Sequence, residues 1–582
     1  MRAGGADGDE VEARGPERDG CRRVGARSAA RAWRGSRGGK GGTRLSDDRS
    51  PGKPPGGGGP RPDRSRRGGG FGKRRGPRPD RGDAGRPERR GGQAGAVNRS
   101  RPVYEERRSV PRRGWASGNG PRSARRGTPE PPQPPPLPSD PREAALRILH
   151  AVDTRGTFSD ILLDRAHAEP ARDPGGSDPR DRSLLHELVK GTLRWRGWLD
   201  HALDARVHIG IDKVQPWVKN VLRMGAYQIL FLDRVPAHAA VDESVKLAHK
   251  YGHPGTAGLV NSVLRRLAEE KETVTPPAGD DPESLAISGS HPLWLTERWC
   301  ERFGPAATRE LLAANNRPAR LGLRVNRLRG TRERLIELLA AEGVTALPAA
   351  VSPDLVWVEG PCAPAKIKAF QEGWCTVQDE SEALVGLLVA PQAHERVLDL
   401  CAAPGGKCTH LAELMGDEGE VWAMERNESR IAALESAVER LATHSVHVVH
   451  GDGRNYTFPM PFDRVLVDAP CSGLGVLGRR ADARWRKGPE VLREMLPAQL
   501  ELLVAGGRRA RPGGVLVYSV CSFEPEETVG VVERFLRQNP SFVLETAAGL
   551  LPEPAVDPNG FMQILPHIHG CDGAFAARFR KT

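Results

Sequence analysis

The sequence predicts a multidomain protein with a disordered basic tail, an all-α domain, a small α+β module and a Rossmann-like α/β domain. Three observations predict this fold class. A length of 582 residues exceeds what one hydrophobic core usually serves. The apolar pattern is helical through the first ordered part. In the C-terminal third it alternates between short strands and helices.

The first 139 residues, rich in Arg, Gly and Pro, hold the excess positive charge of the chain. They contain 34 Arg/Lys and 15 Asp/Glu, whereas the remainder is net negative. The stretch "GGGGPRPDRSRRGGGFGKRRG" has too few large apolar side chains to offset the entropy of ordering, so residues 1–139 are predicted to be disordered. Arg-Gly runs bind nucleic-acid phosphates without sequence specificity, and a solubilising tail is the alternative.

Residues 140–272 carry a helical pattern throughout. Asp140 is a helix cap, Pro141 suits the first helical position, and Glu143 completes a capping box. The stretches "VQPWVKNVLRMGAYQILFL" and "GTAGLVNSVLRRLAEE" place apolar residues at three- and four-residue spacing. We therefore expect a compact all-helical domain, whose Arg and Lys side chains form either an RNA-facing surface or an ordinary solvated face.

Two further domains are expected after a linker over residues 273–289. Residues 290–378 alternate helix and strand, as in "LWLTERWCERFG", "LGLRVN" and "LVWVEG", which predicts a small α+β module. Residues 379–582 contain the short apolar strands "RVLDL", "EVWAME", "VHVVHGD", "DRVLVDAP" and "GGVLVYSVCS". This rhythm predicts a doubly wound, mainly parallel sheet, closed by "GAFAARFRK".

The cysteine pattern and the hydropathy exclude several classes of protein. Nine cysteines show no CxxC pair and no close Cys/His cluster, so neither a disulfide framework nor a metal site is expected. The N-terminus has no apolar signal-peptide core, and no window reaches the roughly 18 apolar residues of a membrane span. We expect a cytoplasmic protein without a membrane contact, in which a free thiol can be a reagent.

The segment "VLDLCAAPGGKCTHLAELM" reads as a strand, a turn and a helix, which is where doubly wound sheets bind ligands. Four acids end consecutive strands: Asp399, Glu425, Asp452 and Asp468. Like charges make a poor pyrophosphate pocket but suit a nucleoside with a cationic end, and S-adenosylmethionine fits. The alternative is that these acids only cap helices. An NAD-dependent dehydrogenase is disfavoured because the GxGxxG fingerprint is missing.

Two cysteines follow apolar strands, Cys471 in "RVLVDAPCSGLG" and Cys521 in "VLVYSVCSFEPEE". A lone cysteine is usually a small buried hydrophobe, but two at neighbouring strand ends favour chemistry. Addition of a thiolate to C6 of cytosine makes C5 nucleophilic toward a sulfonium methyl group, and a C5 proton must then leave before the thiolate is eliminated. The chemistry alone does not say which cysteine adds and which assists release.

The stretches "DLCAAPGGKCTHLAE", "GDGR", "DAPCSGLGVLGRRADARW" and "YSVCSFEPEE" together resemble the RNA 5-methylcytosine methyltransferases of the Sun/RsmB family. Residues 140–272 look like a NusB-type RNA-binding domain, and this architecture implies that the module over residues 290–378 also binds RNA. The resemblance implies a class I methyltransferase domain over residues 379–582. It also implies methyl transfer from S-adenosyl-L-methionine to C5 of a cytosine in small-subunit (16S) ribosomal RNA, through a covalent Cys–C6 adduct. The expected partner is ribosomal RNA before its assembly, and the protein is expected to be a monomer.

The same resemblance assigns roles to individual residues. Cys521 would attack C6, and Cys471 would assist product release. Glu425 would hold the ribose, Asp452 would lie near the adenine, and Asp468 would lie between the methionine end of the cofactor and the target base. The cofactor loop would be lined by Cys401, Ala402, Ala403, Pro404, Gly405, Gly406 and Lys407.

Two alternative functions stay open from the sequence. One is a related methyltransferase that acts on transfer RNA, since only the NusB-like part favours ribosomal RNA. The other is a non-catalytic RNA-binding factor of ribosome assembly, with a vestigial methyltransferase fold. A vestigial site would have decayed loops, yet both cysteines and all four acids are present.

Overall fold

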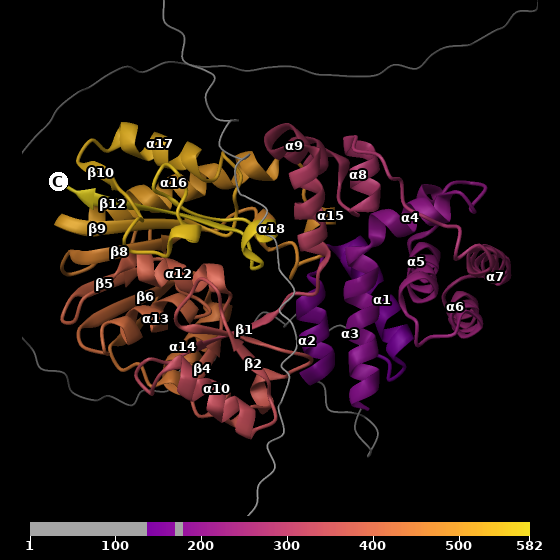
Figure 1. The fold of residues 1–582 in the computed structure, drawn as a ribbon, viewed down its shortest axis with the longest axis horizontal. Coiled ribbons are helices and arrows are strands. Elements are labelled where there is room, and N and C mark those ends of the chain that lie inside the picture. The colour runs from indigo at the N-terminus through magenta and orange to yellow at the C-terminus, as the bar shows by residue number, and fades with distance from the viewer. Residues whose placement is uncertain (1–136, 169–177) are drawn as a thin grey trace, which may run out of the picture. The chain divides into compact units, whose positions relative to one another are not determined.

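The structure, a computed structural model, describes residues 137–168 and 178–582. The predicted tail, residues 1–139, lies almost wholly outside these ranges. Within them, Figure 1 shows a helical part, a small sheet and a large sheet in the predicted order, which confirms the predicted fold class for the ordered domains.

The helical part is built from seven helices in the described residues. They are α1 (Pro141–Arg155), α2 (Ser159–Ala168), α3 (Pro179–Arg194), α4 (Arg196–Asp204), α5 (Pro216–Phe231), α6 (Ala237–Tyr251) and α7 (Pro254–Glu269). Asp140 caps α1 by accepting from the backbone N–H of Glu143 at 2.7 Å. The predicted capping box at Glu143 is wrong, because its carboxylate instead accepts hydrogen bonds from Lys250 and Tyr251, both at the end of α6.

The segment between the helical part and the small module is more ordered than a linker. Asp281 caps α8 (Pro282–Ser288) inside the segment predicted as a linker, accepting from the N–H of Ser284 at 2.9 Å. Helix α9 (Leu293–Asn316) follows and is interrupted at Gly304, where φ is 79°. The next residue, Pro305, lies inside the helix, and a proline there cannot donate the usual backbone hydrogen bond.

The small module has a four-stranded antiparallel sheet in the order β2-β3-β1-β4. Its strands are β1 (Leu321–Val325), β2 (Ala346–Pro348), β3 (Leu355–Val358) and β4 (Cys375–Val377). Its helices are α10 (Arg332–Ala341) and α11 (Lys368–Gln371). The apolar residues of β1 and β3 form a core with α10, which includes Leu323, Val356 and Leu335.

The large sheet has eight strands in the order β10-β12-β9-β8-β5-β6-β7, with β11 paired to β12. Strands β5 to β9 pair in parallel, and β10, β11 and β12 are antiparallel. The C-terminal strand lies between β9 and β10 and does not close the edge, so that part of the prediction is wrong. The strands are β5 (Arg396–Asp399), β6 (Glu420–Glu425), β7 (Val446–His450), β8 (Phe462–Asp468), β9 (Ala510–Val520), β10 (Phe542–Glu545), β11 (Met562–Ile564) and β12 (Ala574–Lys581).

Helices cover both faces of this sheet (Figure 1). Successive residues of each central strand enter opposite cores, as Leu466 and Val467 of β8 do, because side chains alternate along a strand. One core contains α12 and α13, and the other contains α16 and α17. The helices of this domain are α12 (Glu380–Val389), α13 (Gly406–Leu414), α14 (Glu428–Leu441), α15 (Ala483–Arg486), α16 (Val491–Arg509), α17 (Val529–Gln538) and α18 (Pro566–His569).

A loop of the large domain, residues 478–487, contacts the helical part and is called the connecting loop below. Trp485 donates its indole N–H to the carbonyl of Leu193 at the end of α3, at 2.7 Å. Asp482 accepts from the hydroxyl of Ser159 on α2 at 3.0 Å, and both side chains are buried. The connecting loop therefore packs on helices that precede it by about three hundred residues.

Candidate active site

The cofactor loop predicted from the sequence joins β5 to α13. Gly405 caps α13 with a φ of 114°, a backbone conformation that favours glycine. A Cβ at this position would lie 3.1 Å from Leu434 and from Ala437 of α14. The chain can therefore turn tightly from the strand into the helix, and the backbone of residues 401–406 borders open space.

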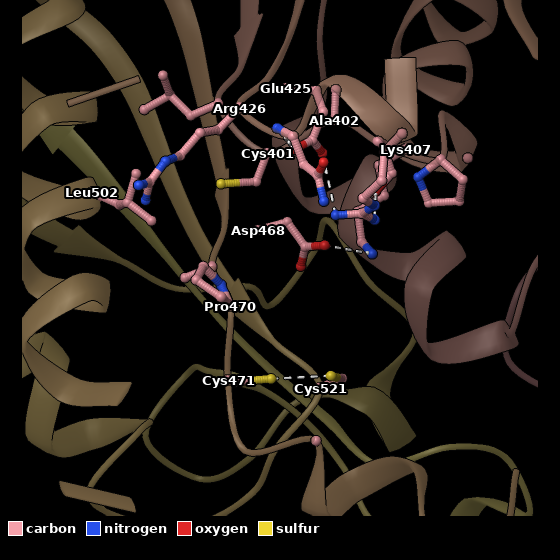
Figure 2. A pocket seen from close by; sticks show the side chains of 18 of the residues that line it. Cys401, Ala402, Lys407, Glu425, Arg426, Asp468, Pro470, Cys471, Leu502 and Cys521 are labelled. Carbon is pink, nitrogen blue, oxygen red and sulfur yellow. Dashed lines mark hydrogen bonds and ion pairs between the residues drawn. The ribbon is translucent and has the colours of Figure 1, made fainter. Parts of the chain in front are cut away.

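A cavity of about 900 Å³ lies at the carboxyl ends of β5, β6 and β8. Figure 2 shows its wall, with side chains from these strands and from the two cysteine loops pointing into it. Two of the residues predicted for the site do not line the cavity: Gly405, which is packed against α14, and Asp399, which is buried. The lining includes Cys401, Ala402, Ala403, Pro404, Gly406, Lys407, Glu425, Asp452, Asp468, Cys471 and Cys521.

The acid that ends β5 does not face the cavity. Asp399 is fully buried, and its Oδ1 accepts from the backbone N–H of Cys401 at 3.2 Å, while its Oδ2 has no hydrogen-bond partner among the described residues. Burial, followed by the charge of Asp468, raises the pKa of Asp399 to about 7. The expectation that four acids form one surface is therefore wrong for this residue, whose hydrogen bond supports the cofactor loop from below.

The acids that end β6 and β7 have arginine partners. Glu425 lies 3.2 Å from Arg430 and accepts from the backbone N–H of Asn427 at 2.6 Å. Asp452 accepts from the backbone N–H and the guanidinium of Arg454, and the latter hydrogen bond lowers the pKa of Asp452 to about 2. These arginines leave the end of the cavity less negative than the acids alone would make it.

Asp468, at the end of β8, forms an ion pair with Lys407 of α13 at 2.9 Å (Figure 2). Its other oxygen accepts from the hydroxyl of Ser519 at 2.7 Å. Burial alone would lower the pKa of Lys407, but the charges of Asp468 and then of Glu382 raise this pKa overall, so the lysine stays charged. The pair fixes both side chains between the cofactor loop and the cysteines.

The two thiols predicted to act together are adjacent. The Sγ atoms of Cys471 and Cys521 lie 3.0 Å apart and point toward each other in Figure 2. The hydrogen bond to Cys521, followed by burial, raises the pKa of Cys471. Cys471 therefore holds its proton firmly, and its thiol lies within hydrogen-bond distance of the sulfur of Cys521.

Sequence models of three families match this chain. They are described as 16S rRNA methyltransferase RsmB/F over residues 386–580, NusB family over residues 139–269, and Methyltr_RsmF/B-like, ferredoxin-like domain over residues 291–364. The three matched ranges coincide with the large-sheet domain, the helical part and the small module.

Curated relatives match over most of their length. A probable ribosomal RNA small subunit methyltransferase B of Synechocystis sp. is 36% identical over 447 residues, which cover 76% of this chain and 99% of the relative. The corresponding protein of Bacillus subtilis is 35% identical over 447 residues, with 76% and 98% covered. The chain belongs to the ribosomal RNA small subunit methyltransferase B family. It is an enzyme, a ribosomal RNA methyltransferase, with a part that matches the NusB family.

A solved structure supports the fold of this family member. The crystal structure of PH0851 has a TM-score of 0.63 and 27% identity, and the match covers 76% of this chain and 99% of that one. Within the described residues, no group of three or more His, Cys, Asp or Glu is arranged to hold a metal ion. In the same ranges, no helix has the length and apolar character needed to cross a membrane.

Sequence reasoning missed the residues that hold the two cysteine loops together. Glu527 is fully buried and accepts from the backbone N–H of Ser472 at 2.6 Å and from the amide of Gln499 at 3.0 Å. The N–H of Gly475 donates to the carbonyl of Cys521 at 3.1 Å. Glu527 is part of the quoted stretch "FEPEE", but no spacing rule links an acid there to a loop fifty-five positions earlier.

Proposed function

We propose that this enzyme transfers a methyl group from S-adenosyl-L-methionine to C5 of a cytosine in small-subunit (16S) ribosomal RNA. The observation that carries the proposal is the pair of thiols, 3.0 Å apart, on the wall of a cavity whose opposite end is formed by the cofactor loop. A cavity of about 900 Å³ is in the size range of small-molecule and cofactor sites.

The residues at the strand ends fit this cofactor. The carboxylate of Glu425 at the end of β6 can accept hydrogen bonds from the ribose hydroxyls. Asp452 follows the neighbouring strand β7, where its carboxylate can accept a hydrogen bond from the adenine amine. The cofactor loop, residues 401–407, offers its backbone along one side, and Asp468 presents a negative charge toward the cationic end. When bound, the cofactor supplies an electrophilic methyl group on a sulfonium.

The adjacent positions of the two thiols, and the raised pKa of Cys471, support different roles for them. The Cys521 thiolate adds to C6 of cytosine, and the electron pair of the C5–C6 double bond moves to make C5 nucleophilic. C5 then takes the methyl group and the proton on C5 passes to solvent. The electron pair of the broken C5–H bond restores the double bond, and the C6–S bond breaks to release the thiolate. Cys471, held as a thiol next to the leaving sulfur, is placed to assist this release.

Membership of the family and the NusB-like part favour ribosomal RNA over transfer RNA as the substrate. Cytosine must leave its stack to reach thiols inside a cavity, and this is easiest in RNA that is not yet assembled. Bisulfite sequencing of total RNA from cells that lack the protein will locate the site. Loss of one modified cytosine in small-subunit RNA is expected, and loss confined to transfer RNA would overturn the choice of substrate.

Two cysteine variants test the chemistry. Cys521→Ala should abolish methyl transfer from labelled cofactor, because no thiolate remains to add to C6. Cys471→Ala should accumulate a protein–RNA adduct that survives denaturant. Cys362→Ala, a half-exposed cysteine of the small module outside the cavity, is the control and should do neither. Normal turnover by Cys521→Ala would contradict the proposed nucleophile.

A further inference from the structure

The two ends of the cavity differ in how their charged groups are paired. At the cofactor end the acids have Arg or Lys partners within 3.2 Å. At the thiol end, Lys487 lines the cavity at the end of the connecting loop. In the described part of the chain, no side chain forms a hydrogen bond or an ion pair with its ammonium group, although it is partly buried. A partly buried cation without a partner is costly, unless an anion is present during function.

The geometry places this ammonium beside the proposed nucleophile. Gly473 follows the Cys471 loop with a φ of 65°. A Cβ built on it would lie 3.5 Å from Nζ of Lys487 and 4.0 Å from Sγ of Cys521. The two atoms are therefore within about 7.5 Å of each other, close enough for one charge to act on the other through a partly dry site. The missing side chain of Gly473 leaves the space between them open.

We propose that Lys487 is a positioning residue whose ammonium group stabilises the thiolate of Cys521, a role that rests on the proposed function of Cys521. When the thiol ionises, its proton passes to solvent, and the negative sulfur is left facing a fixed positive charge. The sulfur of Cys521 and the ammonium of Lys487 therefore carry opposite charges only when the thiol is ionised, which is its reactive form.

The other charged groups around Lys487 are consistent with this role. Cys471 keeps its proton, since the hydrogen bond to Cys521 and burial raise its pKa. Glu527 also faces the lysine, but its carboxylate is occupied by Ser472 and Gln499. Arg480 lines the same wall and adds to the positive charge. Burial lowers the pKa of Lys487, and negative charge on either cysteine opposes this effect. Thiolate and ammonium therefore stabilise each other.

The test measures the reactivity of Cys521 without RNA or cofactor. Wild type, Lys487→Met and Lys487→Arg are alkylated with iodoacetamide, and the peptide that contains Cys521 is quantified by mass spectrometry. Because the thiolate is the reacting form, Lys487→Met should react about tenfold more slowly near pH 7, and the difference should vanish at about pH 10. Lys487→Arg should keep most of the wild-type rate. Lys366→Met, which removes an exposed lysine of the small module, should have no effect.

Two outcomes would overturn the proposal. One is an unchanged alkylation rate in Lys487→Met, and the other is a loss of rate that is the same at every pH. Should Lys487→Met melt at a much lower temperature than wild type, Lys487→Gln is measured in its place under the same criteria. Failure of the proposed function is distinguished by Cys521→Ala, since methyl transfer that persists in that variant rejects the nucleophile and leaves the alkylation result standing.

Discussion

One buried arginine of the small module holds α13, the helix that follows the cofactor loop. Replacing this arginine should destabilise the enzyme strongly. Arg324 on β1 is fully buried. Its guanidinium forms an ion pair with Glu413 of α13 at 2.5 Å and donates to the carbonyl of Gly406 at 2.5 Å. It also donates to the hydroxyl of Thr409 at 3.3 Å. Arg324→Met leaves the Glu413 carboxylate buried without a countercharge.

The loss of stability can be estimated from this geometry. Breaking one partner of a buried ion pair costs about 3–5 kcal/mol, chiefly because the remaining charge is uncompensated. Burial raises the pKa of Glu413 above its unfolded value even in the wild type. In Arg324→Met that pKa rises further, so the part of the penalty that comes from the uncompensated charge is small below about pH 4.3 and grows as the pH increases above it. Replacing both partners in Arg324→Met/Glu413→Leu should recover most of the loss.

Urea denaturation followed by tryptophan fluorescence measures the effect, with Trp357 and Trp374 reporting from the small module. Arg334→Met is the matched control. It breaks an exposed pair with Glu337 of 2.7 Å and should change the free energy of unfolding by less than about 0.5 kcal/mol. A loss below about 1 kcal/mol in Arg324→Met, or a double variant no more stable than the single one, would refute the reasoning.

Three further predictions concern groups beneath and beside the cavity. The first is that the stability of the wild type should decline as the pH rises from about 4 toward 7, and that Asp399→Asn should remove this decline. The reason is that a carboxyl group with a raised pKa favours the folded state only while it is protonated. Denaturation measured at a series of pH values should show the loss of a slope of at most about 1.4 kcal/mol per pH unit. Glu527→Gln should lower kcat about tenfold and leave the Kd of the cofactor unchanged in calorimetry, since the contacts of Glu527 are with the Cys471 loop and Gln499 and not with the cofactor loop. Arg484→Met should lower the melting temperature by several degrees, because about 3 kcal/mol of buried hydrogen bonding is lost; an unchanged melting curve would contradict it.

The order of the ordered domains was predictable because each has its own periodicity. Alternating apolar strands and helices over residues 379–582 predicted the doubly wound sheet, and the strand ends then predicted where Glu425, Asp452 and Asp468 lie. The position of β12 was not predictable, since periodicity identifies a strand but not its neighbours. Antiparallel insertion between β9 and β10 depends on packing that no local pattern encodes.

The site was predictable at the level of motifs and less so at the level of charge. Both cysteines follow recognisable strands, and the structure brings their sulfur atoms together. The exclusion of Asp399 from the cavity could not be foreseen from the sequence. Whether an acid at the end of a strand faces the ligand or the core depends on the exact residue at which the strand ends, and the pattern does not fix that residue. Lys487 was missed for a similar reason. It lies sixteen positions after Cys471, and only the folded loop returns it to the thiols.

The connecting loop makes the helical part and the large domain mechanically dependent. Within this loop, Arg484 is fully buried and donates to the carbonyls of Ser290 and Asn315, and Trp485 is anchored on α3. Lys487 lies two residues further on. A chimera that takes its helical part from a relative must therefore also take the connecting loop of that relative. Otherwise the helical part will not fit the loop, and the wall of the thiol site will shift. Recombination between such enzymes is therefore constrained by a contact that the domain boundaries in the sequence do not reveal.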